Sequence, residues 1–279
     1  MKLPITHFLV VLIFIAFTNC SSQSNEPATD DSTKLPGWNL VWSDEFNYNG
    51  LPDIKKWGYD VADPGWVNEE AQAYYAYRQE NSRVKNGKLI IEARKDNYQG
   101  KPYSSARLVT KNKGDWTYGR IEVRAKLPYG RGTWPAIWML PTVWNLGDGS
   151  WPDNGEIDIM EHVGYDPGVI HASIHCDKYV WTNNTQKTAT VRFNDAMSAF
   201  HTYAMEWDSS EIKMFVDSTK YFSFKNENKG WQTWPFYKDF HLILNIAIGG
   251  SWGGAQGIDN TIFPQRMEVE YVRVYEKAD

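Results

Sequence analysis

The amino-acid sequence predicts an all-β fold, a sandwich or a barrel built from short strands. Apolar and β-branched stretches recur along most of the chain, and clusters of Gly, Pro, Asn and Asp separate them. No stretch carries the long apolar stripe, with a repeat of about 3.6 residues, that a helix of a globular protein buries. Many short strands with turn residues between them are typical of sandwiches and barrels, so both observations favour one fold class.

The predicted strands come from apolar runs and from alternation of apolar and polar residues. The segment 118–127 shows the alternation most clearly, because Ile121, Val123 and Ala125 face one side while charged residues face the other. The predicted strands are 88–93, 118–127, 133–140, 156–161, 170–176, 202–207, 211–216, 240–248 and 268–275.

The N-terminal end of the chain differs in composition from the rest. Lys2 precedes an almost unbroken apolar run at 8–17, and residues 17–20 resemble a bacterial lipoprotein processing site. The run is shorter than the roughly 20 residues that span a bilayer, so residues 1–19 are interpreted as a signal peptide. Cys20 is then the predicted lipidation site, whereas an ordinary cleaved signal would leave it lost or unmodified.

Residues 20–36 are polar and rich in Ser, Thr and Pro, which is typical of a flexible tether. No second break in composition follows, so we expect one monomeric domain over residues 37–279. A lipid on Cys20 would make the protein an exported envelope lipoprotein of the outer membrane, facing either the periplasm or the surface. Cys176 would then remain single, and we expect it to be buried as a small hydrophobe.

Charge and aromatic content narrow the choice of partner. The chain has 29 Lys and Arg against 34 Asp and Glu, a formal charge of −5, and no run of basic residues. We therefore expect no nucleic-acid partner. It also contains 14 Trp, 16 Tyr and 12 Phe, more tryptophan than a sandwich core needs. Since aromatic faces stack on flat apolar partners, the surplus rings suggest a surface that binds sugar rings.

The strongest chemical signal is a predicted strand that concentrates acids in an apolar setting. On a regular strand Glu156 and Asp158 share one face, but strict alternation turns Glu161 into the core. Because an unpaired buried carboxylate is costly, we predict a β-bulge around Ile159-Met160 that returns Glu161 to the acid face. A helix suits the pattern less well, since Glu156 and Glu161 would lie about 140° apart around it.

Acids held on one face repel each other, so their pKa values are driven apart and one can stay protonated while another is ionised. Glycoside hydrolysis needs that division. Retention requires carboxyl groups roughly 5–5.5 Å apart, and inversion about 6.5–9.5 Å. The Cα atoms of Glu156 and Glu161 would lie about 13 Å apart, so the spacing permits retention on a curved sheet without establishing it. A solvated strand face and a calcium site of three acids are the alternatives.

The sequence Gly155-Glu-Ile-Asp-Ile-Met-Glu161 resembles the active-site signature of glycoside hydrolase family 16 in its bulged form. Other landmarks of that family follow in order across most of residues 38–276. They are Trp42-Ser-Asp-Glu-Phe46, Ala106-Arg107, Tyr118-Gly-Arg-Ile-Glu-Val-Arg-Ala-Lys126, Gly132-Thr-Trp-Pro-Ala-Ile-Trp-Met-Leu140, Phe200-His-Thr-Tyr203, Asn245, Gly249-Gly-Ser-Trp252 and Tyr271-Val-Arg-Val-Tyr275. The resemblance implies a curved antiparallel β-jelly-roll sandwich, concanavalin-like, with an open cleft on its concave face.

The same resemblance implies a retaining mechanism that needs no cofactor. Glu156 would be the nucleophile, Glu161 the acid/base, and Asp158 the group that hydrogen-bonds the nucleophile. Residues 132–138 and 151–164 are most similar to endo-β-1,3-glucanases, or laminarinases, so we expect an endo-acting hydrolase of β-1,3-glucan.

Mixed-linkage β-1,3/1,4-glucan is the competing substrate. The family's Asn-x-Glu-Leu-Gln-x-Tyr loop reads Asn68-Glu-Glu-Ala-Gln-Ala-Tyr74 here, and residues 177–187 show no recognisable pattern. A non-catalytic glucan-binding module and a transglycosylase that remodels walls are the alternatives of another class.

Eight residues are expected to contact the glucan. Trp151 and Trp252 lie in turns rich in glycine, where a large ring rarely serves a core, and Asn245 lies on the polar face of the strand at 240–248. The others rest on the resemblance, except that His175 is open between a sugar contact and a partner of the acid/base. The full set is Asn68, Arg107, Trp134, Trp138, Trp151, His175, Asn245 and Trp252.

The resemblance also implies a structural calcium ion on the convex side of the sandwich. Its expected ligands are Glu45, the backbone carbonyl of Gly87, and Glu270, which replaces the usual Asp. Any metal there would serve stability.

Overall fold

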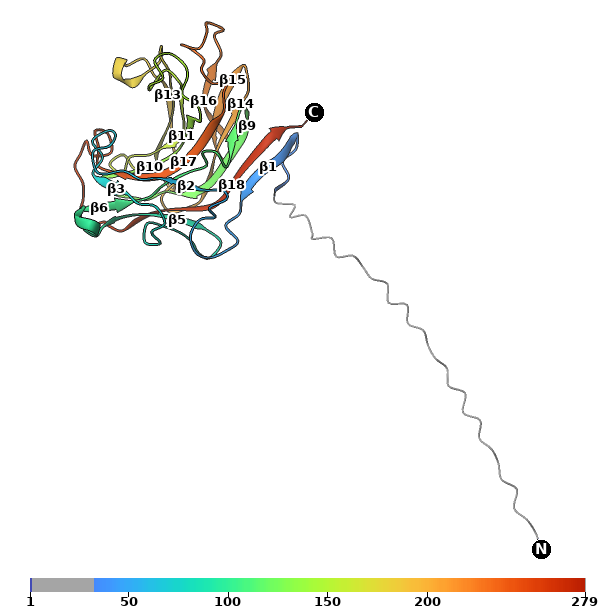
Figure 1. Cartoon of the computed structure of the whole chain (residues 1–279), viewed down its shortest axis with the longest axis vertical. Helices are drawn as coiled ribbons and strands as arrows, with labels where there is room; N and C mark the ends of the chain where they lie inside the picture. Colours follow the sequence, from blue (N-terminus) through green and yellow to red (C-terminus); the bar gives the residue numbers. More distant parts are fainter. Residues whose placement is uncertain (2–32, 279) are drawn as a thin grey trace. The chain divides into compact units, whose positions relative to one another are not determined.

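β-Strands are the main regular secondary structure in the part of the chain that this computed structural model describes, namely Met1 and residues 33–278. Within those residues they form one 10-stranded and one 8-stranded sheet (Figure 1). The all-β jelly-roll prediction is confirmed. The folded unit begins at Leu35, whose backbone bridges to Trp38.

The 10-stranded sheet forms the outer layer of the curved sandwich, and one of its strand pairs is parallel, β3 with β6. Its main path is β16 (Thr219–Lys225), β15 (Glu211–Val216), β14 (His201–Trp207), β9 (Gly119–Lys126), β18 (Gln265–Lys277), β5 (Leu89–Lys95), β6 (Tyr103–Ser105) and β3 (Gln72–Tyr74). β1 (Trp38–Asp44) pairs with β18, and β4 (Ser82–Val84) pairs with β5.

The 8-stranded sheet lies on the inside of the curve, where Figure 1 shows β10, β11, β13 and β17. Its order is β13 (Lys187–Arg192), β12 (Val169–His175), β11 (Glu156–Glu161), β10 (Thr133–Pro141), β17 (Phe240–Ile248), β7 (Arg107–Val109) and β2 (Gly58–Asp60), and β8 (Asp115–Trp116) pairs with β17. Two short 3₁₀ turns, Tyr98–Gly100 and Trp181–Asn183, complete the described elements.

Every predicted strand is present, with ends displaced by a few residues. The prediction missed β2, β3, β4, β6, β7 and β8 because two or three residues are too few to show a period. It also missed β1 and the edge strand β13, whose residues are almost all half-buried or exposed. The alternation of β16, which buries Phe222 and Phe224, is a signal that the prediction omits.

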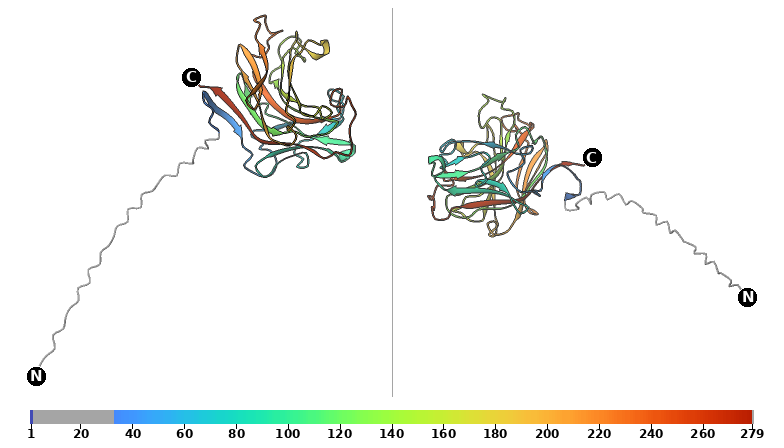
Figure 2. Two further views of the ribbon diagram at one scale, coloured as in Figure 1. Left: turned by 180° about the vertical axis from the view of Figure 1, so that it is seen from behind. Right: turned by 60° about the horizontal axis from the view of Figure 1, so that its bottom comes forward.

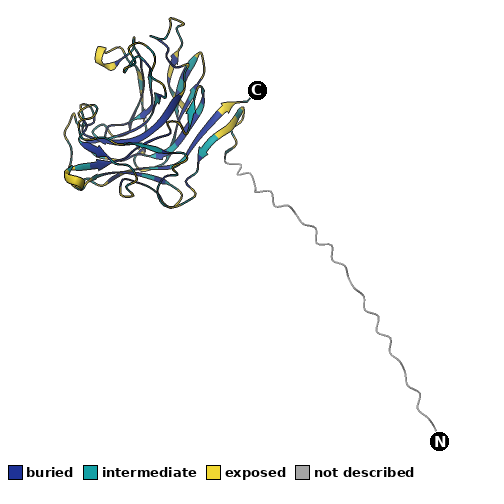
Figure 3. Ribbon diagram, in the orientation of Figure 1, coloured by how far each residue is buried: buried dark blue, intermediate teal, exposed yellow. Residues whose placement is uncertain are grey.

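The hydrophobic core lies between the two sheets, which face each other in all three views (Figures 1 and 2). Ile121, Val123 and Ala125 of β9 are buried in it, as the alternation predicted. Strand β17 is buried along its whole length, and Figure 3 shows it dark blue at the centre. Phe240, Leu242, Leu244, Ile246 and Ile248 belong to the core, so the alternate residues face the other side of the sheet, and Asn245 and Ala247 line the cleft there.

Cys176 is buried and forms no disulfide in the described chain, which agrees with the expected single small hydrophobe. The signal peptide predicted at residues 1–19, apart from Met1, lies outside the described residues, and so do Cys20 and the tether as far as residue 32. Among the described residues no helix has the length and apolar character that crossing a bilayer requires.

Candidate active site

The predicted bulge is present in β11. On one side Met160 pairs with Ile137 and Asp158 pairs with Trp138, so Ile159 is the extra residue. The register against β12 shifts at the same place, between Asp158 and Glu161. The extra residue lets the apolar side chains of the bulge stay in the core while all three acids reach the concave face.

Two tryptophans hold the outer two acids of β11. The Trp151 indole donates a hydrogen bond from Nε1 to Glu156 Oε2 at 2.9 Å. The Trp134 indole donates in the same way to Glu161 Oε1 at 3.0 Å. Each carboxyl is therefore oriented by a rigid ring whose face is also available to a sugar.

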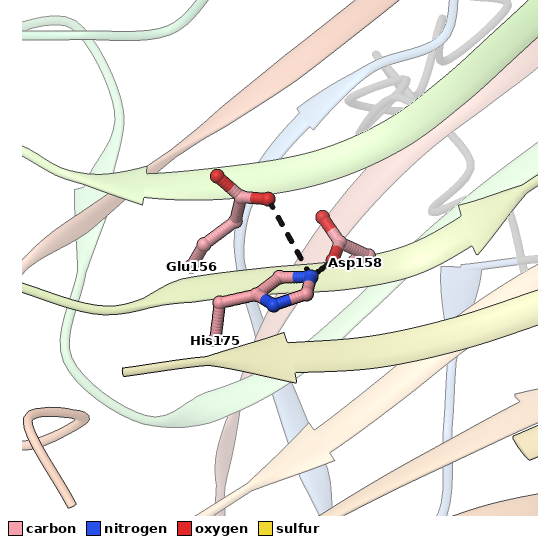
Figure 4. A group of neighbouring side chains, drawn as sticks. All are labelled: Glu156, Asp158 and His175. Atoms are coloured by element: carbon pink, nitrogen blue, oxygen red, sulfur yellow. Dashed lines mark ion pairs between the residues drawn. The ribbon is translucent and has the colours of Figure 1, made fainter. Parts of the chain in front are cut away.

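The middle acid is held between its neighbours and a histidine from the adjacent strand (Figure 4). His175 Nε2 lies 3.3 Å from Asp158 Oδ2 and 4.0 Å from Glu156 Oε1. His175 therefore lies beside Glu156 and Asp158. The residue that pairs with Glu161 across the strands is His171 instead.

Among the described residues, no lysine or arginine forms an ion pair with Glu156, Asp158 or Glu161. Burial is the main cause that raises the pKa of each carboxyl, and it raises the pKa of Glu161 to about 8. The charge of Asp158 raises the pKa of both glutamic acids further. Desolvation and mutual repulsion therefore favour keeping at least one proton in the cluster near neutral pH.

The acids lie in a cleft of about 890 Å³ on the concave face. All eight residues expected to contact the glucan line it, together with the three acids. The structure adds Trp66, Glu70, Trp144, His171, Ser173, Trp181, Gln186, Thr188 and Ser251 to this lining.

One arm of the cleft is built around a buried arginine. The Arg107 guanidinium carbon lies 4.9 Å from the ring centre of Trp66 and 4.6 Å from that of Trp138. Its Nε lies 3.0 Å from Asp60 Oδ2. The Trp138 indole in turn donates to Asn245 Oδ1 at 2.7 Å. This arm therefore presents fixed donors and aromatic faces, as binding of a hydroxyl-rich ring requires.

The glycine-rich loop predicted to carry a binding ring packs directly beside Glu161. Trp252 meets Trp134 edge-on, with ring centres 5.4 Å apart and planes at 80°. Gly249 and Gly250 have φ values of +70° and +78°, a region that residues with a Cβ rarely adopt. A Cβ on Gly253 would lie 2.8 Å from Trp134 Cβ, so the close approach of this loop requires glycine.

A fourth acid in the cleft was not predicted. Glu70 is buried and accepts hydrogen bonds from Gln72 Nε2 at 2.8 Å and from the Tyr74 hydroxyl at 3.2 Å. The side-chain amide of Asn68 donates to its other oxygen at 3.3 Å. Burial raises the pKa of Glu70. The departure of residues 68–74 from the family pattern indicated that this part of the cleft differs, but it did not identify Glu70 as a residue of the cleft.

Trp66 and Trp181 were also missed, and both rings remain about half exposed beside the cleft, at 50% and 48%. Trp66 follows Pro64-Gly65, so the reasoning used for Trp151 would have found it. Trp181 lies in the 3₁₀ turn drawn yellow at the upper left of Figure 1, within the segment whose sequence shows no pattern.

Two of the three expected calcium ligands, Glu45 and Glu270, are paired with arginines. Glu45 accepts two hydrogen bonds from Arg273, at 2.9 and 2.8 Å, and Glu270 accepts one from Arg124 at 2.7 Å. Guanidinium groups therefore already neutralise both carboxylates, and the arrangement does not fit a calcium site.

The fold and site together define an enzyme class, a jelly-roll hydrolase with a carboxyl pair in a saccharide-sized cleft. Residues 69–273 match the model of glycosyl hydrolases family 16, and the chain belongs to that family. It is 55% identical over 252 residues to a β-glucanase of Rhodothermus marinus, covering 88% of each chain.

Solved structures of related enzymes are also similar to this chain. The laminarinase from Rhodothermus marinus has 54% identity and a TM-score of 0.86, over 88% of this chain and all of the other. A non-specific endo-β-1,3(4)-glucanase of the same family, SCLam, has 48% identity and a TM-score of 0.82, over 88% of this chain and 93% of that one.

Proposed function

We propose that this protein is an endo-acting β-1,3-glucanase that hydrolyses its substrate with retention of configuration. The observation that carries the proposal is the bulged strand β11, which turns three uncompensated carboxyls into one aromatic-lined cleft. The similarity to a laminarinase supports β-1,3-glucan as the substrate.

In the first step the ionised Glu156 carboxylate attacks the anomeric carbon, and Glu161 gives its proton to the departing glycosidic oxygen. Burial raises the pKa of Glu161 to about 8, which lets it carry a proton near neutral pH, but it raises the pKa of Glu156 equally. The division of the two roles therefore rests on the similarity to the family and not on these pKa values. The product is a covalent glycosyl-enzyme ester on Glu156.

In the second step Glu161, now ionised, takes a proton from water, which attacks the same carbon and releases Glu156. Two inversions give net retention. Asp158 lies between the two glutamic acids and next to His175, so it is placed to exchange a proton with the nucleophile as the charge on Glu156 disappears and returns.

An endo mode of attack fits an open cleft with rings on both sides of the acids. Trp66 and Trp138 flank Arg107 on one side, and Trp181 lies on the other with Thr188 of β13. A chain can therefore lie across the sheet with neither end enclosed.

Mixed-linkage β-1,3/1,4-glucan is a second candidate substrate, favoured by the likeness to a non-specific endo-β-1,3(4)-glucanase. We further propose that Cys20 carries a lipid that holds a monomeric enzyme on the envelope membrane. The lipoprotein-like sequence at 17–20 supports this proposal.

The decisive experiment incubates the purified protein with laminarin, lichenan and barley glucan, and follows the anomeric protons of the first products by NMR. We expect short oligosaccharides from laminarin that first appear as the β-anomer. Release of the α-anomer would contradict retention, and binding without cleavage would indicate a glucan-binding module. Longer chains formed at the expense of water would indicate a transglycosylase.

Chemical rescue then tests the two roles separately. In Glu156→Ala, azide should restore turnover of an activated aryl β-glucoside and give the α-glycosyl azide, because it enters from the side of the missing nucleophile. In Glu161→Ala the azide product should be β. Identical products from both variants would contradict the assignment.

A further inference from the structure

One group of side chains in the cleft combines two carboxyls with an imidazole. Glu156 and Asp158 share a face of β11, and His175 pairs with Glu156 across from it on β12. One ligand atom from each lies within 4.8 Å of the others (Figure 4). Among the described residues, no other group of three or more His, Cys, Asp and Glu meets this spacing.

We propose that Glu156, Asp158 and His175 form a binding site for a divalent transition-metal ion, with Zn²⁺ as the best fit, and that the bound ion inhibits the enzyme. Imidazole nitrogen and carboxylate oxygen are both ordinary zinc ligands, and three protein ligands with a position left for water is the arrangement of open zinc sites. Ca²⁺ and Mg²⁺ fit less well, because they require more oxygen ligands and rarely accept imidazole.

The two distances from His175 lie close to the spacing that zinc requires, and all three ligand atoms lie within 4.8 Å of one another. Zinc-to-ligand bonds of about 2.0–2.2 Å in a tetrahedron place neighbouring ligand atoms about 3.3–3.6 Å apart. The pair His175 Nε2 and Asp158 Oδ2 is already at 3.3 Å. The pair His175 Nε2 and Glu156 Oε1 is at 4.0 Å, which a small rotation of the Glu156 side chain can close.

An independent observation points to a ligand at this place. Asp158 is 2% exposed, and its Oδ2 accepts no hydrogen bond of good geometry among the described residues, although His175 Nε2 lies 3.3 Å away. Figure 4 shows this carboxyl directed at His175 Nε2. A buried oxygen without a partner costs free energy, and coordination to a cation would remove that cost.

One feature of His175 limits the affinity that we expect of the site for zinc. His175 Nδ1 has no hydrogen-bond partner in the described chain. A zinc-binding histidine is normally held by such a partner, and its loss typically weakens metal binding by about 10–100-fold. We therefore expect micromolar affinity, suited to reversible inhibition and not to a permanent structural ion.

Inhibition follows if Glu156 is the nucleophile, so this consequence rests on the proposed function. A carboxylate bound to zinc cannot attack the anomeric carbon. The ion would also occupy the floor of the cleft, so zinc and glucan should compete, and a higher laminarin concentration should relieve the inhibition.

Calorimetric titration of the untagged protein with ZnCl₂ tests the site without reference to activity. We expect one ion per chain, and binding at least tenfold weaker in His175→Ala. His201→Ala is the matched control, because His201 also lies beside two acids, 3.2 Å from Asp195 and 2.8 Å from Asp217. Loss of binding in the control, with retention in His175→Ala, would overturn the proposal.

A second measurement uses the unaltered protein and so does not depend on any variant folding. Crystals soaked in ZnCl₂ and measured at the zinc absorption edge should give an anomalous peak between Glu156, Asp158 and His175. A peak elsewhere, or none, would refute the site. Zinc bound at this position without loss of laminarin hydrolysis would leave the metal site standing and contradict Glu156 as nucleophile.

Discussion

Two sets of buried acids lie on opposite sides of the same sandwich. On the outer sheet, Glu92 of β5 is fully buried, yet Arg83 approaches it at 2.6 Å, Arg266 at 2.8 Å, and Arg94 also pairs with it. On the inner sheet, the acids of β11 have two indoles and one imidazole as partners and no arginine.

The difference shows which acids are structural and which are available for chemistry. A buried carboxylate surrounded by guanidinium groups has its negative charge compensated in place by hydrogen-bonded ion pairs. An uncompensated cluster is expensive to ionise, so its protons can move within the range a reaction needs. The side chains around an acid decide whether its charge is compensated. On the outer sheet they are arginines, and on the inner sheet they are aromatic rings.

The largest expected effect is on turnover when the inner cluster is altered. Glu156→Gln keeps the shape of the side chain but removes the nucleophile, so kcat on laminarin should fall by at least about 10³-fold. Glu161→Gln should lower it by about 10²–10⁴-fold, the usual contribution of a general acid. Reducing-sugar release measures both, and isothermal titration with a laminari-oligosaccharide should still detect binding.

The same two substitutions lower turnover but should not lower the stability of the fold. Neither Gln variant removes a compensated charge, so urea unfolding should give a free energy equal to or higher than that of the unaltered protein. Strong destabilisation of Glu156→Gln would place that acid in the structural class and break the comparison.

The second prediction concerns the outer acid. Glu92→Gln leaves three guanidinium groups without their carboxylate, and breaking a buried ion pair costs about 3–5 kcal/mol. Because the arginine partners are partly exposed, we expect a smaller loss than that, about 2–3 kcal/mol in the free energy of unfolding. The kcat on laminarin should be unchanged for the folded fraction. A specific loss of kcat would show that this acid is not purely structural.

The contrast between the two sheets also explains which features could be predicted from the sequence alone. The bulge at Ile159 was predictable because the period of a strand and the cost of burying Glu161 are both local facts. The rings of Trp151 and Trp252 were predictable because glycine-rich turns rarely hold core residues.

Long-range pairing could not be predicted in the same way. Glu70 reaches the cleft because the backbone N–H of Ala71 bonds to the carbonyl of Ile248, far along the chain. The arginines beside two of the expected calcium ligands could not be predicted either, since Arg124 and Arg273 reach Glu270 and Glu45 through the pairing of β9, β18 and β1. The sequence shows where an acidic residue occurs, but only the tertiary structure shows which positively charged group lies beside it.

The third prediction concerns Arg107, whose charge is compensated although it lies in the cleft expected to bind substrate. Arg107→Lys keeps the positive charge but loses the planar group between Trp66 and Trp138. We expect KM for laminarin to rise by about tenfold, equivalent to ~1.4 kcal/mol, with kcat changed little. A fall in kcat with an unchanged KM would instead place Arg107 in the chemistry.

The smallest expected effect is a pH dependence of stability that originates in the inner acids. Burial raises the folded-state pKa of Glu161 to about 8, from an ordinary value of 4.5. Between these values the folded state binds more protons than the unfolded state, so the free energy of unfolding falls as pH rises from about 5 to 8. Because Glu156 keeps a side-chain exposure of 16% and Glu161 is only half-buried, we expect a loss of about 1 kcal/mol, not the full effect of burial.

Thermal unfolding at constant ionic strength can measure this slope in the unaltered protein and in Glu161→Gln. The variant lacks one of the coupled carboxyls, so its melting temperature should fall less between pH 5 and 8. Glu92→Gln serves as the control, because removing a compensated acid should not flatten this particular decline. If the unaltered protein becomes more stable over the same interval, the inner acids behave like the outer one, and the uncompensated cluster is not the source of the enzyme's protons.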